Sequence, residues 1–138
     1  MASLEGLLDE VIAVVRAASG IRYAPDDPPS QIATDPAAVV WLASGRSIVG
    51  PPGVATYHHT LRVGLLTAME NIAVANQRIL PRLEPVIDAL WARWSGPGFA
   101  NCQNIGQITF TYGPVEWGGV WYFGAVIDLE DVKIQRTL

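Results

Sequence analysis

The chain has 138 residues, and its 13 acidic and 9 basic side chains leave a net charge of -4 at pH 7. Half of the residues are apolar and only 16% are charged, which excludes a disordered acidic chain, because such chains have few apolar residues and dense charge. The pI of about 5.0 and the single lysine, Lys133, argue against a basic surface that reads nucleic acid.

Residues 1–19 contain an apolar run, but Glu5, Asp9 and Glu10 interrupt it, which is not typical of a secretory signal. No apolar run reaches the roughly 18 residues that a membrane-spanning helix needs. The single cysteine, Cys102, excludes a disulfide framework within the chain and indicates a reducing compartment. We therefore expect one soluble domain, residues 1–138, made in the cytoplasm.

Apolar residues recur every three or four positions from Leu4 to Val15, which predicts a helix over 3–18 with Ser3 as its N-cap and Gly20 as its stop. Residues 24–36 contain four prolines and predict an irregular connection. Residues 37–44 predict a short strand buried on both faces, and residues 45–56 begin with a second Gly/Pro-rich loop.

Alternating residues over 54–66 predict a strand that places Tyr57, His59 and Leu61 on one face. Residues 68–80 are compatible with a helix, although Pro81 is expected to limit it. Residues 83–94 predict a second amphipathic helix, with Pro85 in its first turn because proline deeper in a helix clashes with the preceding turn.

The last third of the chain predicts a wide-tipped hairpin, whose first strand carries Ile108, Phe110 and Tyr112 on one face. In the second strand Trp121 and Phe123 are predicted to be core residues. The alternation changes phase after Leu129, which predicts a β-bulge near 130–131, and residues 135–138 are expected to fray. Together these elements predict an α+β fold: a mostly antiparallel or mixed sheet of four to five strands with two main helices on one face.

The search for catalytic groups favours a protein that is not an enzyme. His58 and His59 are adjacent on a predicted strand and therefore point to opposite faces, so they are poorly placed to share a metal ion. The carboxylate pair Asp26 and Asp27 is expected to cap turns, and the cluster at 128–131 is expected to form a solvated edge. Cys102 has no nearby base in the sequence. We therefore predict no catalytic residue, no metal and no cofactor.

The aromatic residues of the C-terminal hairpin point to interactions instead. Trp117 lies beside a glycine pair at the predicted hairpin tip, where burial within one small domain is not obvious. Exposed aromatic residues are enriched at interfaces, so an interface role and local packing are equally favoured for Trp117.

The order of these elements resembles the tail terminator (tail completion) proteins of long-tailed bacteriophages, and the resemblance covers nearly the whole chain. It rests on the acidic helix Leu4–Val15, the Pro-rich segment Pro25–Pro29 before the strand Val39–Leu42, the histidine-bearing strand Tyr57–Leu66, the helix containing Leu80-Pro81 and Ala89-Leu90, and the hairpin with Tyr112-Gly113 and Trp121-Tyr122-Phe123-Gly124.

The resemblance implies a structural subunit of the phage neck that assembles into a hexameric ring in the host cytoplasm and becomes part of the virion. Such a ring caps the tail tube, stops its polymerisation and joins it to the head-completion proteins, without reading nucleic acid or entering a membrane. Residues 24–36, 45–56 and 113–119 are the candidate contact segments. The candidate interface residues are Asp26, Asp27, Arg46, Tyr57, Trp117 and Tyr122. The alternatives are another neck or tail component, such as a head-completion or tail-tube protein, and a small enzyme that uses a histidine and a carboxylate.

Overall fold

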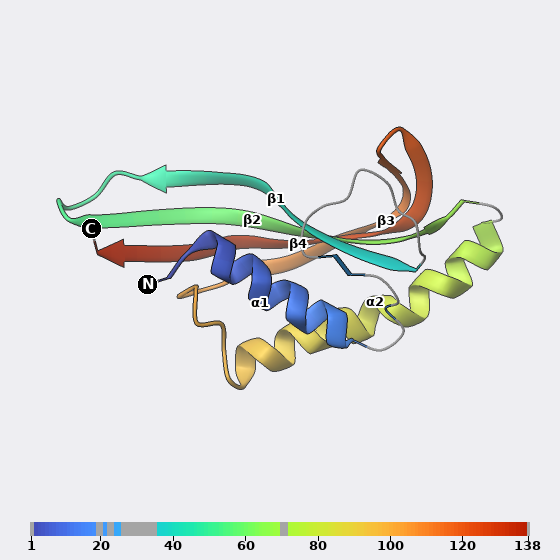
Figure 1. Ribbon diagram of the computed structural model, residues 1–138, viewed down its shortest axis with the longest axis horizontal. Coiled ribbons are helices and arrows are strands. Elements are labelled where there is room, and N and C mark those ends of the chain that lie inside the picture. Colours follow the sequence, from blue (N-terminus) through green and yellow to red (C-terminus); the bar gives the residue numbers. More distant parts are fainter. Residues whose placement is uncertain (1, 19–20, 22–23, 26–35, 70–71, 138) are drawn as a thin grey trace.

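Two helices cover one face of a four-stranded antiparallel sheet in the computed structural model, which describes residues 2–18, 21, 24–25, 36–69 and 72–137 (Figure 1). The elements are α1 (Leu4–Ala17), β1 (Ala37–Ile48), β2 (Val54–Ala68), α2 (Ile72–Ser95), β3 (Gln107–Trp117) and β4 (Val120–Thr137). The strand order is β1-β2-β4-β3. The predicted α+β fold class is confirmed. Asp26, Asp27, Gly20 and most of the proline-rich segment lie outside the described residues.

Helix α1 forms as its sequence predicts. The Ser3 hydroxyl accepts a hydrogen bond from the Gly6 amide at 3.1 Å, which satisfies one of the free amides of the first turn. The helix then buries one apolar stripe against the sheet, made of Leu7, Val11, Ile12 and Val15.

Helix α2 is longer than predicted, because Pro81 and Pro85 both lie inside it. The prediction that Pro81 limits a helix and that Pro85 belongs to a first turn is therefore wrong. Each proline removes one amide donor, and the carbonyls left without that donor belong to Gln77 and Pro81, which are exposed and open to water. Packing of one face on the sheet outweighs the lost bonds; the buried residues are Ala75, Ile79, Leu83, Val86 and Leu90.

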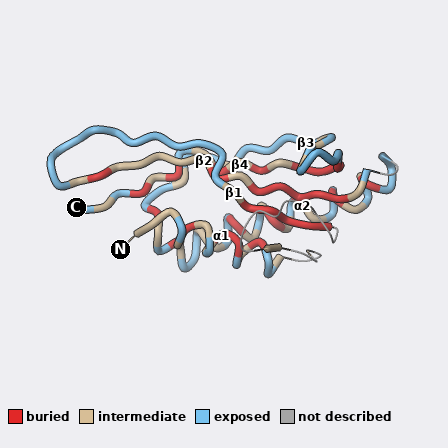
Figure 2. Tube along the Cα trace, turned by 45° about the horizontal axis from the view of Figure 1, so that its top comes forward, coloured by how far each residue is buried: buried red, intermediate tan, exposed pale blue. Residues whose placement is uncertain are grey.

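Strands β1 and β2 pair far beyond the helices. Their register continues to Ile48 opposite Thr56, so the predicted loop at 45–56 is mostly strand, and the connection spans only 49–53. Burial on both faces is confirmed for Ala37–Val40 but not for residues 42–44, which are exposed. Figure 2 shows this contrast between the exposed end of the hairpin and the buried part that faces the helices. The end of the hairpin is held by strand pairing rather than by a core.

The predicted β-bulge in β4 is confirmed. His59 pairs with Val132 and Leu61 pairs with Leu129, so two residues of β4, Glu130 and Asp131, lie opposite one residue of β2. Asp131 adopts a left-handed conformation with φ of 53°. The strand continues to Thr137, opposite Val54, and the prediction that residues 135–137 fray is wrong because they are paired with β2.

The hairpin of β3 and β4 curls away from the plane of the sheet at the end far from the chain termini (Figure 1). Gly113 and Gly124 face each other across the two strands where it curls, and Gly113 has φ of 150°. A small second core lies on the outer face, which carries no helix: Val39, Leu66 and Tyr122 are buried there, with Trp41, Val115 and Trp117 packed against them. Phe123 lies in the main core as predicted, whereas Trp121 is 56% exposed and is not a core residue, because it lies where the hairpin curls away from the helices.

Candidate functional site

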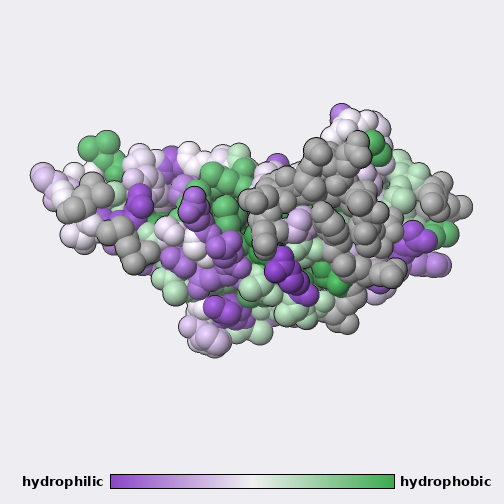
Figure 3. All heavy atoms as spheres, viewed as in Figure 1, coloured by the Kyte–Doolittle hydropathy of each residue, from purple (hydrophilic) through white to green (hydrophobic). Residues whose placement is uncertain are grey.

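The end of the sheet that projects beyond α1 is the candidate site, and we call it the arm. It consists of residues 44–60 of the β1–β2 hairpin together with residues 130–137 of β4. Two of the predicted interface residues, Arg46 and Tyr57, lie in it. At its tip Val49 is 98% exposed, and Figure 3 shows a hydrophobic protrusion at this end of the molecule. Ile48 beside it is 44% exposed, and neighbouring apolar side chains without cover are more informative of a contact surface than a single one.

Tyr57, His59 and Arg136 form a stack on the helix side of the arm. The Tyr57 ring lies 6.0 Å from the His59 ring at an interplanar angle of 10°, and the Arg136 guanidinium carbon lies 5.0 Å from the centre of the Tyr57 ring. These three residues line a recess of about 190 Å³ together with Leu4 and Ile134. The recess is smaller than the roughly 300–1,000 Å³ of typical small-molecule pockets, so it suits a single side chain better than a cofactor.

The polar atoms of this stack are incompletely paired. Arg136 Nε and His59 Nδ1 are buried and have no hydrogen-bond partner among the described residues. Burial, and secondly the charge of His58, lower the pKa of His59 below its usual value, so the imidazole is neutral at pH 7. Arg136 is therefore the cation of the recess. Gly45 leaves room for the His59 ring, because a Cβ at that position would lie 2.5 Å from Nδ1.

Arg46, His58 and Asp131 form a second group on the outer side of the arm. Arg46 lies 3.5 Å from the Asp131 carboxylate, and His58 Nδ1 lies 4.0 Å from the same oxygen. His58 thus approaches Asp131 while His59 stacks on Tyr57, in keeping with the predicted alternation along β2. Within the described part of the chain, no three His, Cys, Asp or Glu side chains gather closely enough to bind a metal ion.

The other two predicted interface residues, Trp117 and Tyr122, lie apart from the arm in the outer-face cluster. The Trp117 ring packs edge-on against Trp41 with centroids 4.9 Å apart. Tyr122 is only 9% exposed, so in this conformation it offers little surface to a partner. Both residues pack within the chain, and a contact of Trp117 with another subunit stays a prediction.

A further exposed surface lies where α2 passes the edge strand β3, and we call it the α2–β3 flank. Leu80 and Trp91 of α2 are 48% and 49% exposed, and Phe110 of β3 is 55% exposed. Two contacts hold the helix and the strand together: the Tyr112 hydroxyl donates to Asn76 Oδ1, and Trp91 and Ile108 line one recess. Sequence reasoning missed this surface: it placed Phe110 and Tyr112 on one face of a strand but did not predict that α2 passes beside that strand.

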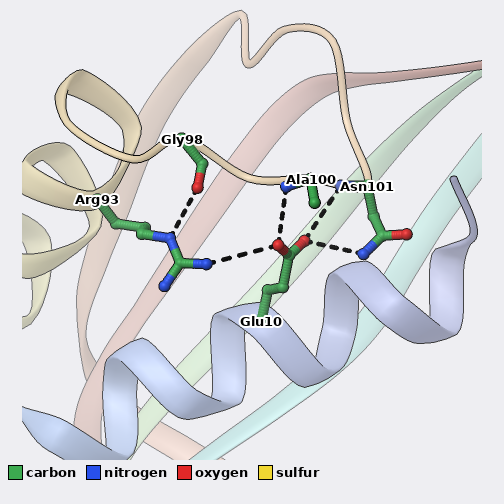
Figure 4. A network of polar contacts seen from close by, with 5 residues as sticks. All are labelled: Glu10, Arg93, Gly98, Ala100 and Asn101. Atoms are coloured by element: carbon green, nitrogen blue, oxygen red, sulfur yellow. Dashed lines mark hydrogen bonds and ion pairs between the residues drawn. The ribbon is translucent and has the colours of Figure 1, made fainter.

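The best-connected polar network of the molecule joins α1 to the segment between α2 and β3 (Figure 4). The Glu10 carboxylate accepts hydrogen bonds from the amides of Ala100 and Asn101 at 2.8 and 3.2 Å and from Asn101 Nδ2 at 3.1 Å. Arg93 lies 3.5 Å from Glu10 and donates through Nε to the Gly98 carbonyl at 2.7 Å. Both carboxylate oxygens of Glu10 and two nitrogens of Arg93 are thus used within the chain, and we assign the network a structural role.

No helix among the described residues is long and apolar enough to span a membrane. No protein-family model matches the chain, and no curated protein matches it at a significant level.

Proposed function

We propose that this chain is a virion structural protein of the bacteriophage neck, resembling the tail terminators. In this proposal it assembles in the host cytoplasm into a ring, of six copies by that resemblance, without catalytic activity or a cofactor. The ring caps the tail tube, stops its polymerisation and joins it to the head-completion proteins.

The observation that carries the proposal is the pair of dissimilar exposed surfaces, the arm and the α2–β3 flank. A ring of identical subunits joins each copy to the next through two different surfaces, one from each neighbour. The arm offers an apolar tip with Val49, and the flank offers Leu80, Trp91 and Phe110. Apolar and aromatic side chains with few charges are typical of the centre of an assembly interface.

Light scattering and electron microscopy test the proposal on the purified protein, alone and mixed with the tail-tube protein that the proposal assigns to it as a partner. We expect closed rings of the protein alone, or rings that close on tube ends where the tube serves as a template. A protein that stays monomeric in both samples would contradict the proposal. Long filaments of the protein alone would favour a tail-tube role instead.

One observation favours the enzyme alternative, namely the approach of His58 to the ion pair of Arg46 and Asp131 on the outer side of the arm. A histidine beside a carboxylate is the usual arrangement of a general base. Metal analysis of the purified protein together with His58→Ala and His59→Ala tests this alternative. It fails if no metal is bound and both substitutions change only stability or assembly.

A further inference from the structure

We propose that Arg136, in the recess on the helix side of the arm, binds the carboxylates of Glu84 and Asp88 on α2 of a second copy of this chain. The contact would place the arm tip against the α2–β3 flank of that copy. This inference rests on the proposed ring, since it names the two surfaces that would join neighbouring subunits.

Arg136 differs from the other arginines that the structure describes. Arg46, Arg62 and Arg93 each lie within 4.0 Å of a carboxylate: Asp131, Asp128 and Glu10, respectively. Arg16, Arg78 and Arg82 also have polar partners. Arg136 has the Tyr57 ring beneath it but no carboxylate or carbonyl partner among the described residues. Its guanidinium therefore remains free to form the paired hydrogen bonds that arginine makes with a carboxylate.

The surroundings of Arg136 make it a favourable anchor for a partner. The Tyr57 ring fixes the plane of the guanidinium, so less side-chain entropy is lost when a carboxylate binds. The residue lies opposite Ala55, close to the exposed tip that carries Ile48 and Val49. A cation beside exposed aliphatic side chains is suited to a partner surface that combines carboxylates with apolar groups.

The α2–β3 flank has that combination. Leu80, Glu84 and Asp88 follow one another at intervals of four on α2, so they form one ridge along the helix, and Trp91 comes three residues later. Glu84 and Asp88 are exposed and have no ion-pair partner among the described residues. Two like charges one turn apart disfavour a helix slightly, and a cation from a neighbouring subunit would remove that penalty.

The charges of the chain also favour a second copy as the occupant. Asp128, Asp131 and Glu10 are already paired within the chain. In the described helices, two acidic pairs lie one turn apart, Glu5 with Asp9 and Glu84 with Asp88, and only the second follows a strongly exposed apolar side chain, Leu80. Arm and flank are different surfaces, so their contact is heterologous, as ring closure requires.

Charge reversal with restoration by mixing tests the inference. Arg136→Glu and the double variant Glu84→Arg/Asp88→Arg are each expected to weaken self-association about 10-fold or more, because each places like charges in contact. An equimolar mixture of the two should restore association, because the arm of each variant then meets a flank of opposite charge. Sedimentation velocity over a dilution series measures both effects, and the same series is run on tube ends if the wild type closes only there.

Two matched controls separate this contact from general charge effects. Lys133→Glu reverses a charge on the outer side of the arm, opposite His58 and away from the Arg136 recess, and Asp9→Arg reverses an exposed charge on α1; both should leave association near that of the wild type. Circular dichroism checks that each variant is folded, and Arg136→Gln serves as a milder variant if Arg136→Glu is not.

The outcomes separate the inference from the proposed function. Rings that persist in Arg136→Glu, or variants that weaken association without restoration on mixing, would overturn the inference and leave the proposed ring intact. Loss of tube binding with self-association unchanged would show that Arg136 contacts the tube protein, which also overturns it. A wild type that stays monomeric with and without tube protein overturns both.

Discussion

At the scale of single residues, Glu10 holds together two segments that are about 90 positions apart in the sequence. Its side chain is 15% exposed and accepts three hydrogen bonds from Ala100 and Asn101. Because the two amides lose their acceptor when the carboxylate is removed, Glu10→Ala should lower the free energy of unfolding by about 2–4 kcal/mol. Urea denaturation measures the change. Asp9→Ala is the control: Asp9 is exposed on the same helix, so its change should stay within about 0.5 kcal/mol.

The ionisation of Cys102 should make the free energy of unfolding depend on pH in the alkaline range. Burial, and secondly the charge of Glu10, raise the pKa of the thiol from 9.0 to about 11. The neutral thiol therefore stabilises the folded chain fully below pH 9, where the folded and the unfolded chain both keep the thiol proton. This stabilisation is lost between pH 9 and 11, where the unfolded chain ionises first. The free energy of unfolding should fall by roughly 2–3 kcal/mol over that range, and the fall should be smaller in Cys102→Ala. Denaturation at pH 8 to 11 measures the free energy of unfolding of the wild type and of Cys102→Ala. An equal fall with pH in both proteins would contradict this assignment.

At the scale of elements, the curl of the β3–β4 hairpin depends on close contact between β4 and β2. A Cβ at Gly124 would lie 1.9 Å from the Leu65 carbonyl oxygen, which is far inside contact distance. Gly124→Ala must therefore shift one of the two backbones, and we expect a loss of about 3 kcal/mol or more in the free energy of unfolding. Gly50→Ala is the matched control, because nothing lies within 4 Å of a Cβ there. A stable Gly124→Ala protein would contradict the close packing of these strands.

The curled hairpin is held against the outer face of β1 by Trp41 and Trp117. Their edge-on contact should give a coupling free energy of about 0.5–1.5 kcal/mol in a double-mutant cycle of Trp41→Ala and Trp117→Ala. Thermal unfolding measures the cycle, and light scattering on the same variants measures assembly. Additive losses of stability combined with weaker assembly would instead place Trp117 at a subunit contact.

Much of the fold can be predicted from local patterns in the sequence. Four features leave a signal in nearby residues and are confirmed: the apolar stripe of α1, its Ser3 cap, the alternation around Leu61 and the bulge at Asp131. The prolines of α2 mislead, because tertiary packing of one face outweighs the lost hydrogen bonds.

The candidate site is harder to predict than the fold. Arg46 and Tyr57 carry polar and aromatic side chains that stand out in the sequence, but Arg136 has no local signal. Its position over the Tyr57 ring, 79 positions away in the sequence, depends on the pairing of β2 with β4. Strand β1 also extends beyond Trp41 because it pairs there with β2, and its own residues do not predict that extension.

At the scale of the whole molecule, the low charge of the sequence has two structural causes. One part of the apolar content fills two cores, on the helix side and on the outer face of the sheet. Another part is exposed on the arm and on the α2–β3 flank, where Val49, Trp91 and Phe110 face solvent, and at the tip of the β3–β4 hairpin, where Trp121 does. Exposed apolar groups on separate surfaces are expected of a subunit that is completed by its neighbours.

A substitution at the arm tip should affect the stability of the assembly but not that of the isolated subunit. Val49 is 98% exposed, so Val49→Asp should change the free energy of unfolding of the isolated subunit by no more than about 0.5 kcal/mol. In an assembly that buries the tip, the new carboxylate loses its water and approaches the acidic ridge of α2. The melting temperature of the wild type should rise with protein concentration, because association stabilises the folded state by mass action, and this rise should be absent in Val49→Asp. Ser44→Asp adds the same charge to an exposed position on the outer side of the arm, away from Arg136, and should keep most of the rise. An unchanged concentration dependence in Val49→Asp would exclude the arm tip from the subunit contact.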